Sequence, residues 1–285
     1  MNSPAVSAAA REEEVSAPAA PPEEHPGRAR RVLRAIRRSD TLWFLATLLL
    51  AALAWEYFVK WRQIPRYLLP RPSEILETSI DQRDVLLHNT WVTGKEVVYG
   101  FAAACLLGVP LAAAIVYSKI LDRLISPLLV AIQTIPKVAM APLFVVWLGH
   151  GLAPKIFVAC TIAFFPIVID TTVGLRSANP GSIELVRSMG ANRWQTFRKV
   201  QFPGALPSIF GGLEVAITLA VVGAVVSEYI AANEGLGYLQ LTASGILNTP
   251  LLFASVIAMS ILGLILFRVV QIIERLVIPW HVKHR

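Results

Sequence analysis

The chain has 285 residues, of which 55% are hydrophobic and only 16% are charged, and its mean hydropathy is +0.59. A soluble domain carries roughly 25% charged residues, so this chain has too few of them to cover a globular surface. Its formal net charge of +7 does not require nucleic acid, because lysine and arginine gathered in membrane loops give the same sign. The composition therefore predicts an all-α protein that crosses a bilayer several times.

The N-terminal segment, residues 1–40, predicts a disordered cytoplasmic tail, because its first part is rich in Ala, Pro and Glu and lacks aromatic residues. Its end, residues 28–38, places Val32, Leu33 and Ile36 on one helical face with arginines around the rest. That pattern is typical of a helix lying on an anionic leaflet. Nucleic-acid binding is the alternative for this basic stretch, and the apolar segment that follows it disfavours that alternative.

Residues 41–285 predict a transmembrane domain with six spanning helices, since a helix needs about 20 apolar residues to cross the hydrocarbon. The six apolar segments are Leu42–Val59, Val97–Tyr117, Leu124–Leu148, Ile156–Leu175, Leu213–Ala232 and Leu251–Ile273. The first could instead be a secretory signal, because arginines precede it and Ala52-Leu-Ala54 resembles a cleavage site. Cys105 and Cys160 lie inside apolar segments, so both are predicted to be core residues.

Loop charge predicts the orientation of these spans. With a cytoplasmic N-terminus, the inside segments carry 17 lysines and arginines and the outside segments carry seven. One outside segment, residues 60–96, does not follow this trend, because it holds six of the seven outside lysines and arginines. The same segment also holds five acidic residues. Because cytoplasmic loops are enriched in basic residues, the N-terminus and residues 176–205 are expected inside.

Residues 176–205, between the fourth and fifth spans, carry several helix signals. Asn179-Pro180 predicts a helix start, with an N-cap side chain before proline at the first helical position. Gly190 predicts its end, where a left-handed C′ residue is needed. Asn192 and Gln195 have the spacing of a capping box that opens a second short helix.

Both short helices are predicted to be amphipathic. Pro203 is expected to end the second helix. Ile183, Val186 and Met189 repeat on one face of the first helix. The second helix places Trp194, Phe197 and Val200 on one side and Arg193, Arg198 and Lys199 on the other. The segment therefore predicts a helical hairpin, and pattern alone leaves open whether it binds a partner or rests on lipid headgroups.

The stretch Glu184-Leu-Val-Arg-Ser-Met-Gly190, followed by nine residues and Val200-Gln-Phe-Pro203, resembles the EAA loop of bacterial ABC-importer permeases. That family's motif has Glu-Ala-Ala, three residues, Gly, nine residues and Ile-x-Leu-Pro. Leu185 and Val186 replace the two alanines, which leaves the fine fit open. The resemblance implies a type I ABC importer permease fold of six helices and a helix that couples to an ATPase. The residues to which it assigns coupling are Glu184, Val186, Arg187, Met189, Gly190, Ala191, Trp194, Phe197 and Pro203.

Three further stretches are similar to the nitrate, sulfonate and taurine branch of this family. They are Gln133–Gly149, Leu69–Glu74 and Glu234–Leu239, and the resemblance covers about residues 65–280. It implies as solute a sulfonate, taurine, nitrate or a small heterocyclic or aromatic nutrient.

Charged and polar residues inside the spans are candidates for a solute pathway, because burying a charge in the bilayer is costly. Lys137 lies between Pro136 and Pro142, which predict a kink in a helix whose backbone faces protein or a water-filled cavity there. A cation there would attract an anionic solute. The other candidates are Gln133, Glu214 and Glu228. The alternative for Lys137 is a structural ion pair with Asp170, Glu214 or Glu228.

The chain contains no Walker A loop and no metalloprotease or nucleophile-elbow motif. It is therefore expected to carry no cofactor and not to be an enzyme. The resemblance implies that a partner ATPase binds ATP and Mg. The implied partners are a second permease copy (a homodimer), two cytoplasmic ATPases, an external solute-binding protein and the lipid of a bacterial inner membrane. An ion-coupled secondary carrier that relays protons through Glu214, Asp170 or Glu228 is the alternative, and a membrane-embedded enzyme ranks third.

Overall fold

The computed structural model describes residues 40–279, and these contain helices and turns but no β-strand. The chain divides into two units, residues 1–54 and residues 55–285. The first unit contributes only the start of one helix to the described part. The predicted tail and the basic helix over residues 28–38 lie outside the described residues, so the boundary at residue 40 stays a prediction.

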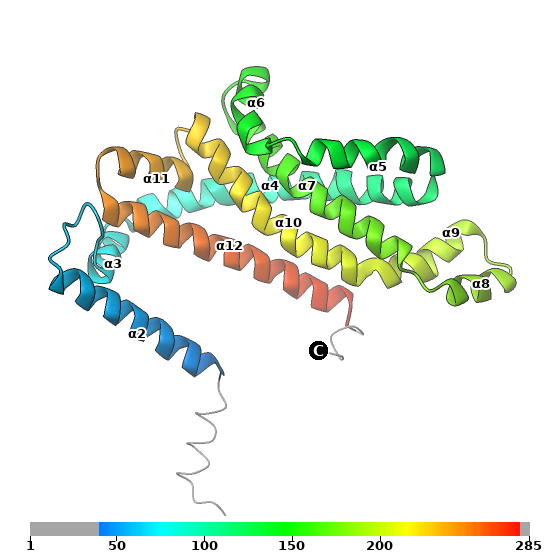
Figure 1. Ribbon diagram of the computed structural model, residues 1–285, viewed down its shortest axis with the longest axis horizontal. Helices are drawn as coiled ribbons and strands as arrows, with labels where there is room; N and C mark the ends of the chain where they lie inside the picture. The colour runs from blue at the N-terminus through cyan, green and yellow to red at the C-terminus, as the bar shows by residue number, and fades with distance from the viewer. Residues whose placement is uncertain (1–39, 280–285) are drawn as a thin grey trace, which may run out of the picture. The chain divides into compact units, whose positions relative to one another are not determined.

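The described helices follow one another with short connections (Figure 1). In chain order they are α2 (Asp40–Trp61), α3 (Pro72–Asp81), α4 (Arg83–Tyr117), α5 (Lys119–Gln133), η1 (Lys137–Met140), α6 (Ala141–Leu148), α7 (Leu152–Arg176), α8 (Pro180–Ser188), α9 (Arg193–Thr196), η2 (Phe197–Gln201), α10 (Phe202–Ala231), α11 (Leu236–Gly245) and α12 (Thr249–Val277). Within residues 55–285, α8 and α9 lie at one end of the helix layer and α11 lies at the other.

The predicted spans correspond to α2, α4, the α5–α6 pair, α7, α10 and α12. Among the described residues, four helices are long and apolar enough to cross a membrane, namely α4, α7, α10 with its N-terminal extension, and α12. The pair α5 and η1–α6 passes the same test together, but it bends by 84° at the break. The third span, predicted as one helix with a proline kink, is therefore two helices that meet at a sharp bend.

The central packing joins α7 to α4 and α10 through small residues. A Cβ added at Gly100 of α4 would lie 2.5 Å from Cβ of Ala159, and one added at Gly223 of α10 would lie 2.7 Å from its Cα. Helices that meet across such small residues bring their backbones close together, which favours association in lipid. This contact fixes α4, α7 and α10 as one body.

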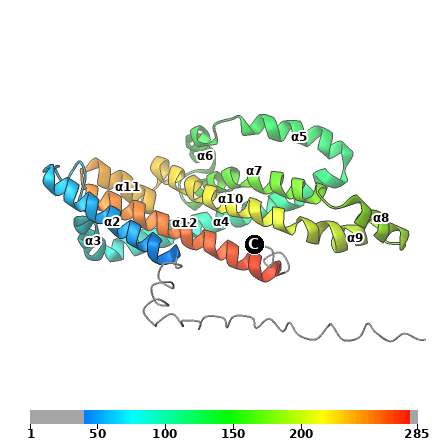
Figure 2. The same ribbon diagram turned by 60° about the horizontal axis from the view of Figure 1, so that its bottom comes forward.

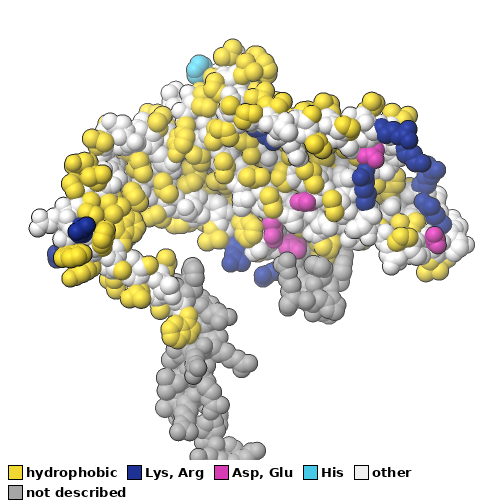
Figure 3. All heavy atoms as spheres, viewed as in Figure 1, with side chains coloured by type: hydrophobic (Ala, Val, Ile, Leu, Met, Phe, Trp, Pro, Cys, Tyr) yellow, Lys and Arg dark blue, Asp and Glu magenta, His cyan; other side chains and the backbone are white. Residues whose placement is uncertain are grey.

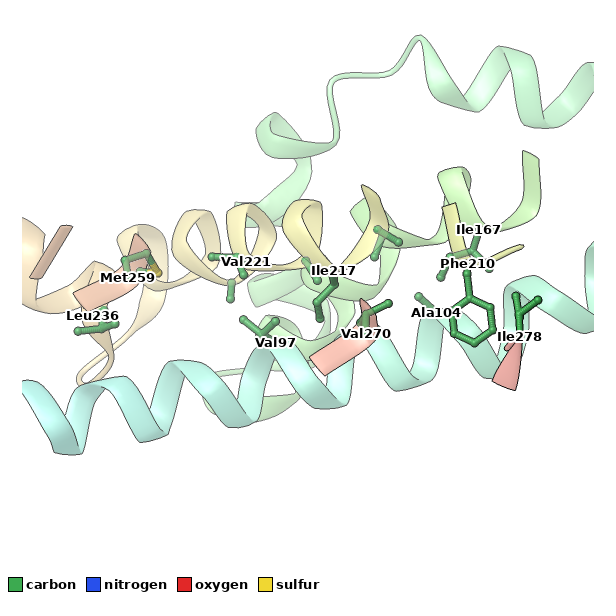
Figure 4. Close-up of a cluster of buried hydrophobic side chains, with 14 residues drawn as sticks. Val97, Ala104, Ile167, Phe210, Ile217, Val221, Leu236, Met259, Val270 and Ile278 are labelled. Carbon is green, nitrogen blue, oxygen red and sulfur yellow. The ribbon is translucent and has the colours of Figure 1, made fainter. Parts of the chain in front are cut away.

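The largest buried cluster runs along these three helices and reaches α11 and α12 (Figure 4). Its members include Val97, Ile167, Ile217, Leu236 and Met259. Cys105 and Cys160 are half-buried free thiols packed against the same cluster, which confirms their predicted core positions.

The periphery is apolar, and hydrophobic side chains cover much of the face in Figure 3. α5 lies at the edge of the unit in both ribbon views (Figures 1 and 2), and none of its residues is buried. An exposed apolar surface of this extent suits contact with lipid or with another membrane subunit. Lysine and arginine gather at the end where α8 and α9 lie.

Candidate functional site

α8 begins and ends at the residues that the sequence predicts. Oδ1 of Asn179 accepts a hydrogen bond of 2.9 Å from the backbone N–H of Gly181, and Pro180 is the first helical residue. At the other end Gly190 has a φ of +84°, in the left-handed region. The N–H of Gly190 donates to the carbonyl of Arg187, and that of Ala191 donates to the carbonyl of Val186. These two bonds form a Schellman motif, so the sharp turn after α8 is encoded locally.

The capping box of the second helix is also present. The N–H of Gln195 donates to Oδ1 of Asn192 (2.8 Å), and the N–H of Asn192 donates to Oε1 of Gln195 (2.9 Å). The prediction that Pro203 ends this helix is wrong. The chain continues from α9 through a π-helical turn, in which the N–H of Phe202 donates to the carbonyl of Phe197, directly into α10. The wider turn accommodates the proline without breaking the helix.

The α8–α9 segment presents large apolar side chains to its surroundings. Leu185, Met189 and Trp194 are 63%, 79% and 66% exposed. Ile183 and Val186 are half-buried instead, so Met189 does not share their environment as the three-residue spacing predicts. Exposed apolar residues on a short, well-capped helix are typical of a surface that binds a protein partner.

An aromatic cluster joins this segment to the end of α4. The Phe197 ring packs edge-on against Tyr117 at a centroid distance of 5.3 Å and lies 5.4 Å from Trp194. The hydroxyl of Tyr117 also donates to Gln201. Together with Arg193 and two alanines of α4, the three rings line a recess of about 320 Å³. The contacts tie the exposed segment to a long helix that runs to the far end of the unit.

The remaining coupling candidates lie along the same segment. Glu184 and Arg187 are exposed on α8, Ala191 is half-buried after the turn, and Pro203 is half-buried at the start of α10. The structure therefore brings all nine candidates into one continuous stretch.

The break between α5 and α6 carries two of the pathway candidates. Gln133 is the last residue of α5 and Lys137 the first of η1, and both are half-buried. Nζ of Lys137 lies 4.2 Å from the centroid of the Phe165 ring of α7, a cation–π contact. The two prolines predict a kink within one helix, whereas the structure separates α5 from η1 altogether, and the face of the Phe165 ring contacts the lysine at this break.

The other pathway candidates lie on α10, 14 residues apart and hence about 21 Å apart along the axis. Glu214 is half-buried in the middle of the helix, while Glu228 is buried near its end. Asp170, a predicted alternative partner of Lys137, lies against Gly212 of α10. A pathway role for Gln133, Lys137, Glu214 and Glu228 stays a prediction.

Side chains from other helices bind the N-terminus of α11, at the end opposite α8. The N–H of Gly235 donates to Oδ1 of Asn89 (2.7 Å), and the N–H of Leu236 donates to Oγ1 of Thr93 (2.8 Å). Helix N-termini leave N–H groups without partners inside the helix, so these bonds satisfy them and fix α11 on α4.

Glu228 completes this set of contacts. Its Oε2 accepts from the N–H of Gly237, and its Oε1 accepts from the hydroxyl of Thr93 at 2.6 Å. A Cβ added at Gly235 would lie 2.1 Å from Oε1 of Glu228, and φ of Gly235 is +119°. Only glycine therefore fits this turn. The carboxyl group of Glu228 sits where the helix dipole favours an anion.

A buried ion pair lies beside Glu228. Nζ of Lys155 is 2.6 Å from Oε1 of Glu96 and 3.4 Å from the carbonyl oxygen of Glu234, and the Lys155 and Glu96 side chains are 7% and 0% exposed. The side chain of Glu234, on the loop before α11, forms an exposed pair with His88 of α4 at 3.2 Å. Sequence reasoning missed this cluster, although Glu96 and Lys155 directly precede two predicted spans that begin on the same side.

The described residues offer no cluster of three or more His, Cys, Asp or Glu side chains that could hold a metal ion. The polar groups of the α11 end bond to one another, whereas the α8–α9 end exposes apolar side chains.

Residues 104–279 match the sequence model of the family described as binding-protein-dependent transport system inner membrane component. The match covers more than half of the chain. The chain belongs to this family. It is a multi-pass membrane protein of the ABC-importer permease type, as the EAA-loop resemblance predicts.

The curated relatives are transport permeases, and the chain aligns with most of the length of each. The chain is 36% identical to the formylaminopyrimidine transport permease protein ThiX of Halalkalibacterium halodurans over 244 residues, which are 85% of this chain and 96% of that one. It is 35% identical to the riboflavin transport system permease protein RibX of Chloroflexus aurantiacus, over 82% and 88% of the two chains. It is 27% identical to the taurine transport system permease protein TauC of Escherichia coli, over 83% and 89%.

A solved structure titled as inward-facing conformations of the MetNI methionine ABC transporter has the same fold. The TM-score is 0.62 at 22% identity, covering 69% of this chain and 98% of that one. The fold is therefore that of a type I importer permease. The family match and the curated relatives show that the chain is the permease subunit of a binding-protein-dependent importer of a small solute. An ion-coupled secondary carrier is not supported.

Proposed function

We propose that this permease uses the α8–α9 segment as its ATPase-docking surface, with that end of the spans in the cytoplasm. The observation that carries the proposal is the short, doubly capped segment that exposes Leu185, Met189 and Trp194. Capping fixes the backbone before a partner binds, so little ordering entropy is lost on docking. The basic residues gathered at this end support a cytoplasmic location.

The complete importer holds two copies of the chain, two ATPase subunits that bind ATP and Mg, and an external solute-binding protein. Family membership supports this composition, and the apolar, unburied α5 suits contact with a second copy. The α11 end then faces outward. It carries a recess of about 590 Å³ whose lining includes Arg66, Asp81 and Asn248, and a polar recess on that face suits contact with the binding protein.

We infer a small heterocyclic solute, because the relatives at 36% and 35% identity are named for formylaminopyrimidine and riboflavin. Sulfonates and taurine are the alternative. Lys137 at the broken span contributes a cation to the pathway, and Lys137→Met is expected to lower transport without loss of assembly. Unchanged transport in that variant would remove Lys137 from the pathway.

The test reconstitutes the permease, its ATPase and the neighbouring binding protein in vesicles. Uptake of a pyrimidine or flavin ligand should require all three proteins and ATP. A ligand panel that includes taurine and an alkanesulfonate identifies the solute class. Uptake without ATP or without the ATPase subunit would contradict the proposed function.

A further inference from the structure

The C-terminus of α11 ends in the same kind of turn as α8, but with a different residue at the decisive position. The N–H of Leu247 donates to the carbonyl of Ser244 (3.1 Å), and the N–H of Asn248 donates to the carbonyl of Ala243 (2.8 Å). These two bonds form a Schellman motif, as the equivalent bonds do after α8. Leu247 has a φ of +55°, in the left-handed region that Gly190 occupies at the corresponding position. Two equivalent turns therefore carry glycine in one case and leucine in the other.

Leucine is an unfavourable residue for this turn. In the left-handed region a Cβ lies too close to the following carbonyl oxygen, a strain that glycine avoids. Packing does not offset the strain, because the Leu247 side chain is 66% exposed, and the preceding Ile246 is 73% exposed. A strained residue whose side chain adds little to the folded core points to a function for that side chain.

Ile246 and Leu247, the 246–247 pair, lie beside charged groups. Both residues line the recess of about 590 Å³ at this end, together with Arg66 and Asp81. Neither Arg66 nor Asp81 takes part in an ion pair among the described residues. An apolar centre next to a polar, charged rim is the usual anatomy of a protein–protein contact. The surface therefore suits a protein partner.

Hydrogen bonds on the C-terminal side hold the 246–247 pair in place. Oγ1 of Thr249 donates to the carbonyl of Tyr67 at 2.6 Å, which ties the turn to the segment between α2 and α3. Oδ1 of Asn248 accepts from the N–H of Leu251 at 3.4 Å and caps α12. The turn is fixed before a partner binds, so docking there costs little ordering entropy.

We propose that the 246–247 pair is the apolar anchor through which the permease binds its external solute-binding protein. The leucine is strained, but glycine at the same position would leave the turn without half of the anchor. The inference rests on the proposed function, which places the α11 end at the outer face. The matched family depends on a binding protein, and this partner must dock on the face opposite the ATPase.

Leu247→Asn separates docking from folding. Asparagine tolerates the left-handed region, so the turn is retained while the apolar side chain is removed. The melting temperature should stay the same or rise by about 2–4 °C as strain is relieved. The affinity for the binding protein should fall about tenfold or more, because a buried leucine side chain is lost from the contact. Leu247→Gly should give the same loss of affinity.

Leu87→Asn is the matched control. Leu87 is 67% exposed at the same end of the unit, but it lies on the regular helical backbone of α4. Asparagine is a poorer helix former than leucine, so this variant should melt slightly lower than the unmodified protein. Its affinity for the binding protein should be unchanged, because Leu87 does not line the recess.

The experiment titrates the complex of permease and ATPase, held in lipid nanodiscs, with the fluorescently labelled neighbouring binding protein. In vesicles, Leu247→Asn should need more binding protein for half-maximal uptake and should reach the same maximal rate. Unchanged affinity in both Leu247 variants, or an equal loss in Leu87→Asn, would overturn the inference. Dissociation of the two permease copies in the Leu247 variants would also overturn it, because the pair would then contact a second copy.

The unmodified complex separates this inference from the proposed function. If it binds the binding protein and transports with ATP, the proposed function stands whatever the Leu247 variants do. If it does not bind the protein at all, the proposed function fails together with the inference.

Discussion

The two ends of the helix layer differ in where their polar and apolar groups lie. At the α11 end, buried charges and helix N–H groups are bonded to one another across α4, α7 and α10. At the α8–α9 end, the backbone is satisfied by its own caps while Leu185, Met189 and Trp194 stay exposed. The contrast indicates that the α11 end is held together by interactions within one chain, whereas the α8–α9 end is completed by a partner.

The largest expected effect of a substitution is on stability at the α11 end. Lys155→Met leaves two buried carboxyl groups without their cation, and removing one partner of a buried pair costs about 3–5 kcal/mol. We expect a much lower melting temperature and a poor yield of folded protein. His88→Gln is the matched control, because its pair with Glu234 is exposed and contributes about 1 kcal/mol or less. Equal effects of the two variants would contradict the distinction between a buried and an exposed pair.

Gly190 provides the corresponding test at the other end. A β-branched residue at its φ of +84° costs about 1–2 kcal/mol, which weakens the turn between α8 and α9. No described atom lies within 4 Å of an added Cβ, so strain and partner fit are the only causes of damage. Gly190→Val should insert normally, yet lose about tenfold or more in ATP-coupled transport.

Gly190→Asn is the control for that variant, because asparagine tolerates the left-handed region. It should retain more coupled transport than valine when uptake, ATPase activity and co-purification are measured on one sample. Normal coupling in Gly190→Val would argue against α8–α9 as the ATPase-docking surface.

A smaller effect is expected where only exposed surface is removed. Met189→Ser deletes an exposed apolar side chain, so the melting temperature should change little. If docking buries this side chain, ATPase affinity should fall about threefold to tenfold. Leu76→Ser on α3, also an exposed residue, should leave ATPase affinity unchanged. An affinity loss of equal size in both variants would mean that the effect is not local to the docking surface.

The sequence predicts the α8–α9 end better than the α11 end, for a physical reason. Caps at Asn179, Gly190 and Asn192 depend on neighbours within a few residues, so local rules describe them. Lys155 and Glu96 are 59 residues apart in the chain, and only tertiary packing brings them together.

Intermediate cases show where local rules fail. Pro203 predicts a helix end, but a π-helical turn carries the helix past it. Two prolines predict a kink near Lys137, but the structure has a break between two helices there, and the contact of that lysine with Phe165 comes from a third helix, α7. Proline therefore marks the position of an irregularity, and packing decides its form.

The most direct test of the contrast measures thiol accessibility at both ends in one protein background. Two single-cysteine variants, Met189→Cys and Ile246→Cys, are made in a chain that also carries Cys105→Ala and Cys160→Ala. Both substituted positions are exposed. The ends are then labelled with a membrane-impermeant maleimide in sealed vesicles, with and without bound ATPase subunits. We expect Met189→Cys to be labelled only from the cytoplasmic side and to be protected by the ATPase, and we expect Ile246→Cys to be labelled only from outside and to be unaffected by the ATPase. Labelling of both positions from one side, or no protection of Met189→Cys, would contradict this contrast.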